Sequence, residues 1–208
     1  MGTISTLIFF IVNKLTVSQV ETKFHDFDFT KFQKPGRNKG ERGQLIELAL
    51  GIANSSQLND LIDGEIKSYT IGETIAVTQL KHCLEEIIEQ KVEFDESKVG
   101  KKLERTIYVG FTRKNEYVGN ITINTKTNTE HYKRLAEDYG YICSQIKLAY
   151  SEGRELNTIT GPNQLLQIRT KASKNRNGQY TPICYNGVYL KNKGMAFYLL
   201  ANFGKTIL

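Results

Sequence analysis

Hydrophobic and polar residues along the chain follow the helical period in some segments and the strand period in others. TEHYKRLAEDYGYICSQIKLAYSEG, residues 129–153, predicts a long amphipathic helix, and LKHCLEEIIEQ, residues 80–90, predicts a second helix. TIYVGF, residues 106–111, and VGNITINT, residues 118–125, predict strands because they are rich in β-branched and aromatic residues. Helices and strands therefore mix along the chain, and we expect an α/β (α+β) fold, a mixed sheet flanked by helices.

The amino-terminal part carries two further patterns. STLIFFIV, residues 5–12, is too short to span a bilayer, and it lacks a preceding basic residue and a following cleavage site. We expect a buried strand or helical turn there rather than a secretion signal. TKFHDFDFTKFQ, residues 22–33, alternates aromatic and charged residues and predicts a strand-like arm that leads into a basic loop. We therefore expect residues 1–36 to form an arm packed on the core, ahead of a domain at residues 37–208.

A third helix is expected to start near Glu41 and to continue through GQLIELALGIA. Glu47 shares one narrow stripe of that helix with Gln44 and Gly51, and the rest of its surface is almost wholly apolar. The pattern predicts a half-buried carboxylate at Glu47, which needs a cation or a hydrogen-bond donor beside it. The plainer alternative is a glutamate that caps the helix or lies at its surface edge.

The stretch DLIDGEIKSYT, residues 60–70, follows this helix and concentrates charged residues. Asp63-Gly64 is a signal for a two-residue hairpin, which predicts that Asp60, Glu65 and Lys67 project from one face. Carboxylates supply hard oxygen ligands to Mg²⁺, and a lysine can orient the attacking water or stabilise charge during phosphodiester hydrolysis. The alternative is a solvated hairpin with one cross-strand ion pair of little energetic weight.

Composition narrows the choice of partner and compartment. The formal net charge is +6, and lysine and arginine recur along most of the chain, which favours a polyanionic partner. Cys83, Cys143 and Cys184 lie far apart without a CxxC pair, so they favour neither a disulfide framework nor a zinc site, and we expect a reducing, cytoplasmic compartment. The three histidines are isolated from one another in the sequence, so no histidine metal cluster is expected.

Several separated motifs follow one another along the chain. They are NKGERGQLIELALG followed by NDLIDGEIKSY, then LLQIRTKAS, and then GVYLKNKGMAFYLLANF. From about Arg37 to near the end of the chain, these motifs and their order resemble the MutH family of endonucleases. The family belongs to the PD-(D/E)xK superfamily and includes the mismatch-repair nicking endonuclease and related restriction endonucleases that cleave at GATC. The resemblance implies a restriction-endonuclease-like core whose two lobes form a DNA-binding cleft, with a catalytic lobe at about 37–125 and a DNA-reading lobe at about 126–208.

The resemblance also implies roles for individual residues. The catalytic positions are Glu47, Asp60, Glu65 and Lys67, and the metal-binding positions are Glu47, Asp60, Glu65 and Ile66, for Mg²⁺ with Mn²⁺ as a substitute. The implied DNA-binding positions are Lys39, Arg169, Lys171, Tyr189 and Lys191, and the basic loop QIRTKASKNRNGQY adds Lys174 and Arg176 as backbone anchors. Tyr189 matches a tyrosine near the adenine whose methylation is sensed, although its sequence context also suits a core residue.

Two features depart from the family pattern. The family carries a lysine at the strand entry KKLERTIYVGF, where the nearest aligned residue is Glu104, with Lys101, Lys102 and Arg105 beside it, so that lysine's role is not assigned. The spacing from Asp60 to Glu65 is also short, which leaves Asp63 as a second candidate for the role of Asp60.

The sequence thus predicts a Mg²⁺-dependent type II restriction endonuclease that hydrolyses double-stranded DNA at GATC or a related site. Cleavage would leave 5′-phosphate and 3′-hydroxyl ends. One alternative is a MutH-type repair endonuclease that nicks hemimethylated DNA after activation by a partner protein, and another is a non-catalytic DNA-binding module. No membrane partner is expected, and the sequence leaves open whether two chains form a homodimer.

Overall fold

The computed structural model describes residues 14–32, 40–52, 58–171, 174 and 177–207. The α-helices are α1 Val17–Phe24, α2 Glu41–Ala49, α3 Lys98–Glu104, α4 Thr129–Ser151 and α5 Ala201–Thr206. The strands are β1 Glu65–Thr70, β2 Ile75–Gln79, β3 Arg105–Phe111, β4 Tyr117–Asn124, β5 Ile159–Thr160, β6 Leu166–Thr170, β7 Ile183–Tyr185, β8 Val188–Lys191 and β9 Met195–Leu199. Short 3-10 helices cover Phe29–Phe32 and Leu80–His82, and a π-helical turn covers Glu86–Gln90.

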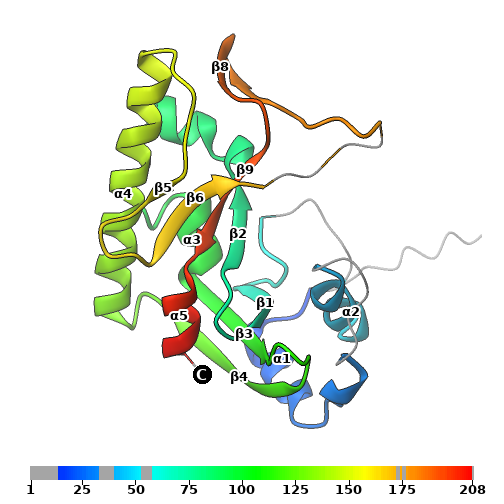
Figure 1. Cartoon of the computed structure of the whole chain (residues 1–208). Coiled ribbons are helices and arrows are strands. Elements are labelled where there is room, and N and C mark those ends of the chain that lie inside the picture. Colours follow the sequence, from blue (N-terminus) through cyan, green and yellow to red (C-terminus); the bar gives the residue numbers. More distant parts are fainter. Residues whose placement is uncertain (1–13, 33–39, 53–57, 172–173, 175–176, 208) are drawn as a thin grey trace, which may run out of the picture.

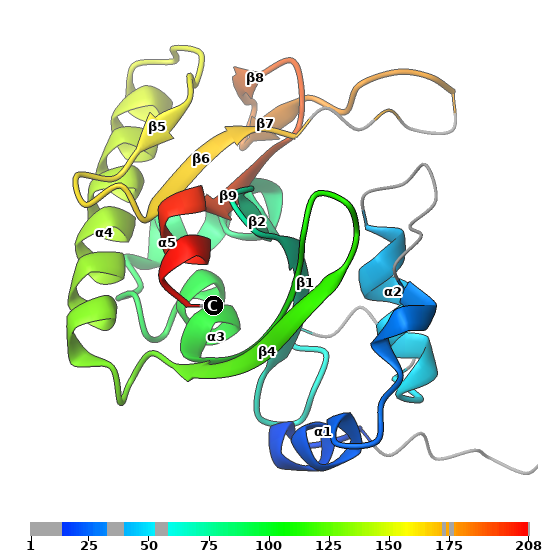
Figure 2. The same cartoon turned by 60° about the horizontal axis from the view of Figure 1, so that its bottom comes forward.

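The described strands form one mixed sheet, one antiparallel sheet and a hairpin (Figures 1 and 2). The mixed sheet has the order β1-β3-β4, with β1 parallel and β4 antiparallel to β3. The antiparallel sheet has the order β2-β9-β6-β5, and β7 pairs with β8. The turn between β7 and β8 is Asn186-Gly187, whose positive φ angles of 44° and 80° suit a two-residue hairpin turn. The predicted α+β class, with a mixed sheet and flanking helices, is therefore confirmed.

The central strand β3 is buried on both faces and separates two hydrophobic clusters. Tyr108 belongs to the larger cluster, whereas Ile107, Val109 and Phe111 belong to the smaller one. This division follows from the alternation of side chains along a strand. The larger cluster lies between α3, α4 and the antiparallel sheet, and the smaller one joins α1 and α2 to the mixed sheet.

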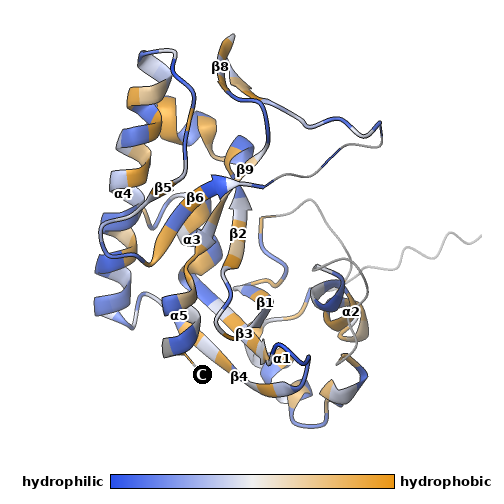
Figure 3. Ribbon diagram, viewed as in Figure 1, coloured by the Kyte–Doolittle hydropathy of each residue, from blue (hydrophilic) through white to orange (hydrophobic). Residues whose placement is uncertain are grey.

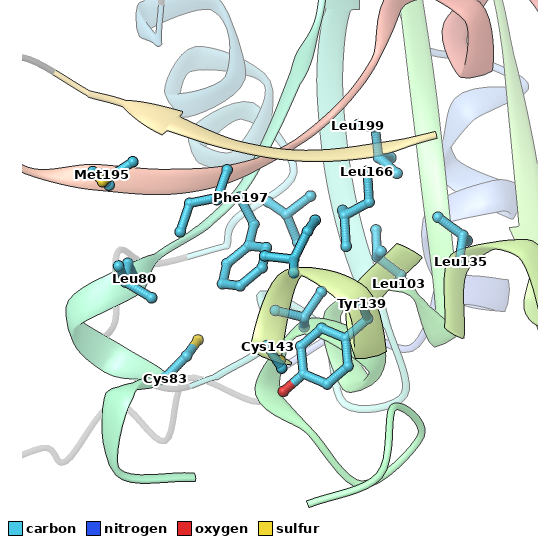
Figure 4. Packing of buried hydrophobic residues seen from close by; sticks show 14 of the residues in the cluster. Leu80, Cys83, Leu103, Leu135, Tyr139, Cys143, Leu166, Met195, Phe197 and Leu199 are labelled. Carbon is cyan, nitrogen blue, oxygen red and sulfur yellow. The ribbon is translucent and has the colours of Figure 1, made fainter. Parts of the chain in front are cut away.

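The long helix α4 closes the larger cluster. Hydrophobic and hydrophilic residues alternate along it in Figure 3, as expected of a helix with one buried face. Tyr139 and Cys143 of α4 point into the same interior as Phe197 of β9 in Figure 4, and the ring centroids of Tyr139 and Phe197 are 6.1 Å apart. The predicted amphipathic helix over residues 129–153 and the predicted strands at residues 106–111 and 118–125 are confirmed.

The strand predicted over residues 22–33 is wrong. A capping box between Thr16 and Gln19 starts α1, which runs to Phe24 and is followed by the 3-10 helix Phe29–Phe32. The phenylalanines of this segment pack on one another, and Phe29 stacks on Tyr117 of β4 at 4.1 Å between ring centroids. The aromatic residues therefore serve as contacts in the smaller cluster. The apolar run at residues 5–12 lies outside the described residues.

The hairpin predicted at Asp63-Gly64 is also wrong, although a strand does begin at Glu65. Residues 58–64 form no strand, and β1 pairs in parallel with β3. Asp63 Oδ1 accepts a hydrogen bond from the Val17 amide at 2.7 Å, and Asp63 Oδ2 lies 2.5 Å from Arg105 NH1. A Cβ atom at Gly64 would lie 2.4 Å from the Arg105 carbonyl oxygen, so glycine allows the chain to pass close to β3 there.

The segment predicted as a helix over residues 80–90 is helical but irregular, with a 3-10 helix followed by the π-helical turn. No helix within the described part of the chain is long and apolar enough to cross a membrane.

Asp138 of α4 is fully buried and fastens this helix to the antiparallel sheet. Its carboxylate accepts hydrogen bonds from the backbone amides of Asn163, Leu165 and Leu166 at 2.6 to 2.9 Å. Asp138→Ala leaves these donors without an acceptor, so we expect the free energy of unfolding in urea to fall by about 3 kcal/mol or more.

Glu137→Ala is the matched control, because exposed Glu137 accepts only a side-chain hydrogen bond from the same Asn163, at 2.8 Å. It should cost less than about 1 kcal/mol. Equal losses for the two variants would contradict the role given to Asp138.

Candidate functional site

The candidate site is centred on Glu65, the first residue of β1, which is 0% exposed. Its Oε1 atom accepts hydrogen bonds from Lys67 Nζ and from Lys102 Nζ, the latter at 2.8 Å. Its Oε2 atom accepts a hydrogen bond from the Asp60 backbone amide at 3.0 Å. A buried carboxylate is thus held by two ammonium groups and one backbone donor, which compensates for its loss of hydration.

The parallel pairing of β1 with β3 explains how these groups meet. Glu65 and Lys67 are two residues apart on β1 and so share a face. Glu65 lies opposite Thr106 at the start of β3, and α3 ends just before that strand. The last turn of α3 therefore brings Lys102 beside Glu65. The loop before β1 brings Asp60, whose Oδ2 is 3.8 Å from Lys67 Nζ.

Two lysines keep Glu65 ionised. Burial alone would raise the pKa of Glu65, but the charges of Lys67 and Lys102 lower it below its ordinary value. Burial would likewise lower the pKa of Lys67, but the charges of Glu65, Asp60 and Glu47 raise it. The pair is therefore charged in the folded protein over the whole neutral range.

The other two acids are in the opposite electrostatic situation. Burial, followed by the charge of Glu65, raises the pKa of Asp60. Burial, followed by the charge of Asp60, raises the pKa of Glu47 to about 7. Glu47 reaches this position because α2 approaches β1, where a Cβ atom at Gly43 would lie 3.3 Å from Ser68 Oγ. The half-buried setting predicted for Glu47 is thus observed.

Two acids of this cluster are available to a hard divalent cation. Asp60 and Glu47 could supply carboxylate oxygen ligands, and a cation beside them would offset the burial and the negative charges that raise their pKa values. Both oxygens of Glu65, the third acid predicted as a ligand, already accept hydrogen bonds from Lys67, Lys102 and the Asp60 amide. The side chain of Ile66 is buried in the smaller cluster, so only its backbone carbonyl could add a ligand. Within the described ranges, no group of three or more His, Cys, Asp or Glu residues is already arranged to hold a metal ion.

The structure brings together Glu47, Asp60, Glu65 and Lys67, the residues that the sequence singled out; their catalytic roles stay a prediction. Asp63, the second candidate for the role of Asp60, is turned away toward Val17 and Arg105. Lys102 was missed, and Glu104, the residue nearest in alignment to the family lysine, instead pairs with Lys126 at 2.9 Å. Lys101 and Lys102, just before β3, were the sequence signal for a cation at this place. Only the parallel pairing of β1 with β3 shows that Lys102 reaches Glu65.

The described DNA-binding candidates lie on or beside the antiparallel sheet and the β7–β8 hairpin. Arg169 of β6 donates a hydrogen bond to Thr74 Oγ1 at 2.6 Å and lies over the Tyr198 ring, 4.3 Å from its centre. Lys191 pairs with Glu155 at 3.0 Å. Lys174 is exposed, with its Nζ 5.4 Å from the centre of the Tyr180 ring.

Tyr189 is 47% exposed, so the alternative that it is a core residue is wrong. Lys39 and Arg176 lie outside the described residues.

A cleft of about 730 Å³ opens beside the acidic cluster. Lys102 lines the cleft and also contacts Glu65, so it joins the cleft to the candidate site. The lining comes from segments far apart in the sequence, and Lys171 is part of it. Its residues are Leu58, Ala76, Val77, Thr78, Gln79, Lys81, His82, Glu85, Lys98, Lys102, Lys171, Tyr185 and Ala196.

No protein-family model matches the chain, and no curated protein matches it. The resemblance to the MutH family therefore rests on the sequence motifs themselves.

The raised pKa of Glu47 predicts a pH effect on stability in metal-free protein. Between its ordinary pKa of 4.5 and the folded value of about 7, the folded state binds more protons at Glu47 than the unfolded state does. This residue therefore makes the wild-type chain lose stability as the pH rises through that window. Glu47→Gln removes this effect, so the variant should become more stable relative to the wild type as the pH rises from about 4.5 to about 7.

Urea unfolding in EDTA at about pH 4.5 and about pH 7.5 measures this difference. Glu41→Gln, on the first turn of the same helix, should keep the wild-type pH dependence. Parallel pH curves for the wild type and Glu47→Gln would contradict the assignment.

The exposure of Tyr189 predicts that Tyr189→Ala changes the free energy of unfolding by no more than about 0.5 kcal/mol. Its neighbour Leu190 is 0% exposed, so Leu190→Ala should cost about 2 to 5 kcal/mol. Both values can be measured by urea unfolding. A loss at Tyr189 as large as that at Leu190 would give the ring a packing role.

Proposed function

We propose that this chain is a Mg²⁺-dependent endonuclease of the type II restriction kind, which hydrolyses phosphodiester bonds in double-stranded DNA. The observation that carries the proposal is the convergence of Glu47, Asp60 and Glu65 with Lys67 and Lys102 beside a lysine-lined cleft. The motifs shared with the MutH family support a restriction-endonuclease-like core with two lobes. They also support GATC or a related sequence as the target.

Each group of the site has a distinct part in the proposed reaction. Bound Mg²⁺ would supply Lewis-acid stabilisation of charge on the phosphate and a more acidic water. Asp60 and Glu47, whose pKa values are raised, are the carboxylates that would hold it. Glu65 keeps its charge and fixes the Lys67 ammonium by a hydrogen bond.

Lys67 would then orient the attacking water or stabilise the negative charge that accumulates on the phosphate oxygens in the transition state. Its ammonium lies between Glu65 and Asp60, so it is held at the place where the scissile phosphate would approach the acids. Lys102 would neutralise the remaining charge of Glu65 and face the cleft. The bases and phosphates of the recognition sequence would be contacted by Arg169, Lys171, Lys174, Tyr189 and Lys191.

Plasmid cleavage tests the proposal. Plasmids with unmethylated and with adenine-methylated GATC sites are incubated with the chain and Mg²⁺, and the ends are sequenced. We expect cleavage at a defined short site that stops on addition of EDTA. Asp60→Asn and Lys67→Ala should each lower the rate at least about 100-fold, because they remove a metal ligand and the charge-stabilising ammonium.

Asp63→Asn is the matched control, since this acid lies three residues from Asp60 but faces Arg105, and it should cut at the wild-type rate. Thermal melting of each variant separates loss of chemistry from loss of folding. Nicking confined to hemimethylated DNA would favour the repair-type alternative. Binding without any metal-dependent cutting would leave a DNA-binding module.

A further inference from the structure

One wall of the cleft carries cations that the resemblance to the MutH family does not assign. Lys81 and His82 are exposed on the 3-10 helix Leu80–His82, and Lys98 is the first residue of α3. Lys102 follows Lys98 by one helical turn on the same face and contacts Glu65. The cations therefore form a row that ends at the acidic cluster.

Contacts with the surrounding structure hold this row in place. Lys98 Nζ donates a hydrogen bond to the His82 carbonyl oxygen at 2.5 Å, which ties the 3-10 helix to α3. The Lys98 backbone amide donates to the buried carboxylate of Glu86 at 3.1 Å. Lys98 and the 3-10 helix are thus fixed to the folded chain, and this helix presents Lys81 and His82 at the surface.

The cations are close enough to act on one another. Burial, followed by the charges of Lys81, Lys98 and Lys102, lowers the pKa of His82. Every charge that shifts the pKa of His82 is positive, and Glu85, an acid that lines the same cleft, accepts a hydrogen bond from Gln90 Nε2 at 3.2 Å. The electrostatic potential at this wall is therefore positive, which favours the binding of an anion.

We propose that Lys81, His82 and Lys98 bind the phosphodiester backbone of DNA at phosphates next to the one that reaches the acidic cluster. A row of cations along a cleft of about 730 Å³ matches a ligand with regularly repeated negative charges better than a single small anion. The inference rests on the proposed function in taking DNA as the ligand. It assigns Lys81, His82 and Lys98 to binding and positioning of the substrate.

Proton uptake should accompany this binding. A phosphate beside His82 favours its imidazolium form, because it offsets the repulsion from Lys81, Lys98 and Lys102. The pKa of His82 would then be higher in the complex than in the free chain. Affinity for DNA should therefore fall as the pH rises from the pKa of His82 in the free chain to its pKa in the complex.

Fluorescence anisotropy with a labelled duplex of about 20 base pairs, in EDTA without divalent metal, tests the proposal. Lys81→Gln and Lys98→Gln should each weaken binding about 3- to 10-fold near 0.1 M salt and reduce the slope of log K against log salt by about one. Lys133→Gln, at an exposed position on α4, should change neither quantity. His82→Gln should flatten the dependence of affinity on pH.

Unchanged affinity and salt slope in Lys81→Gln and Lys98→Gln would overturn the proposal, as would an equal effect of Lys133→Gln. Inorganic pyrophosphate serves as the small-anion probe. Variants that no longer bind pyrophosphate but bind the duplex as tightly as the wild type would also overturn the proposal. Thermal melting confirms that each variant is folded.

The metal-free assay separates this inference from the nuclease proposal. If duplex binding depends on Lys81 and Lys98 but the chain never cuts, the proposed DNA-binding role of these cations is supported and only the nuclease proposal is overturned. If both variants cut normally and bind as the wild type does, only the proposed DNA-binding role is overturned.

Discussion

The ionised Glu65 at the start of β1 is the interaction on which the candidate site depends. A buried carboxylate loses its hydration, and this loss is compensated only if charge partners and donors surround it with good geometry. Glu65 obtains them from its own strand, from α3 and from the preceding loop, through Lys67, Lys102 and the Asp60 amide. The same contacts therefore fix the end of α3, the first residues of β1 and the loop that carries Asp60.

This arrangement divides the acids into two kinds. Glu65 is stabilised in its charged form, whereas the pKa values of Asp60 and Glu47 are raised by burial and by neighbouring acids. Adjacent groups whose environments push their pKa values apart are characteristic of functional sites. Here the acids with raised pKa values lie at the more accessible side of the cluster, where a cation and a phosphate could reach them.

Local patterns predicted part of this structure correctly. The residues of α4, β3 and β4 have strong periodicity, and their own sequence determines their secondary structure. Glu65 and Lys67 share a face for any pairing of β1, because side chains alternate along every strand. The shared face of Glu65 and Lys67 was therefore predictable from the sequence even though the predicted hairpin was wrong.

The wrong hairpin and the missed Lys102 come from contacts between residues distant in sequence. Asp63-Gly64 is a good local turn signal, but Asp63 instead contacts Val17 and Arg105, which lie 46 and 42 residues away. Likewise, Lys102 reaches Glu65 across 37 residues, through a parallel pairing that no local pattern encodes.

The two sheets are coupled by a short connection that matters for the proposed reaction. β1 ends at Thr70 and β2 begins at Ile75, so residues 71–74 alone link the strand of the acidic cluster to the antiparallel sheet. Arg169 of β6 donates its hydrogen bond to Thr74, within this link. If Arg169 contacts a base of the DNA, this hydrogen bond would fix its position relative to Glu65 and Lys67 through the backbone of β1. Base contacts made by β6 and the phosphate held by the acidic cluster would then be kept in a fixed relation, as cutting at a defined distance from a recognised sequence requires.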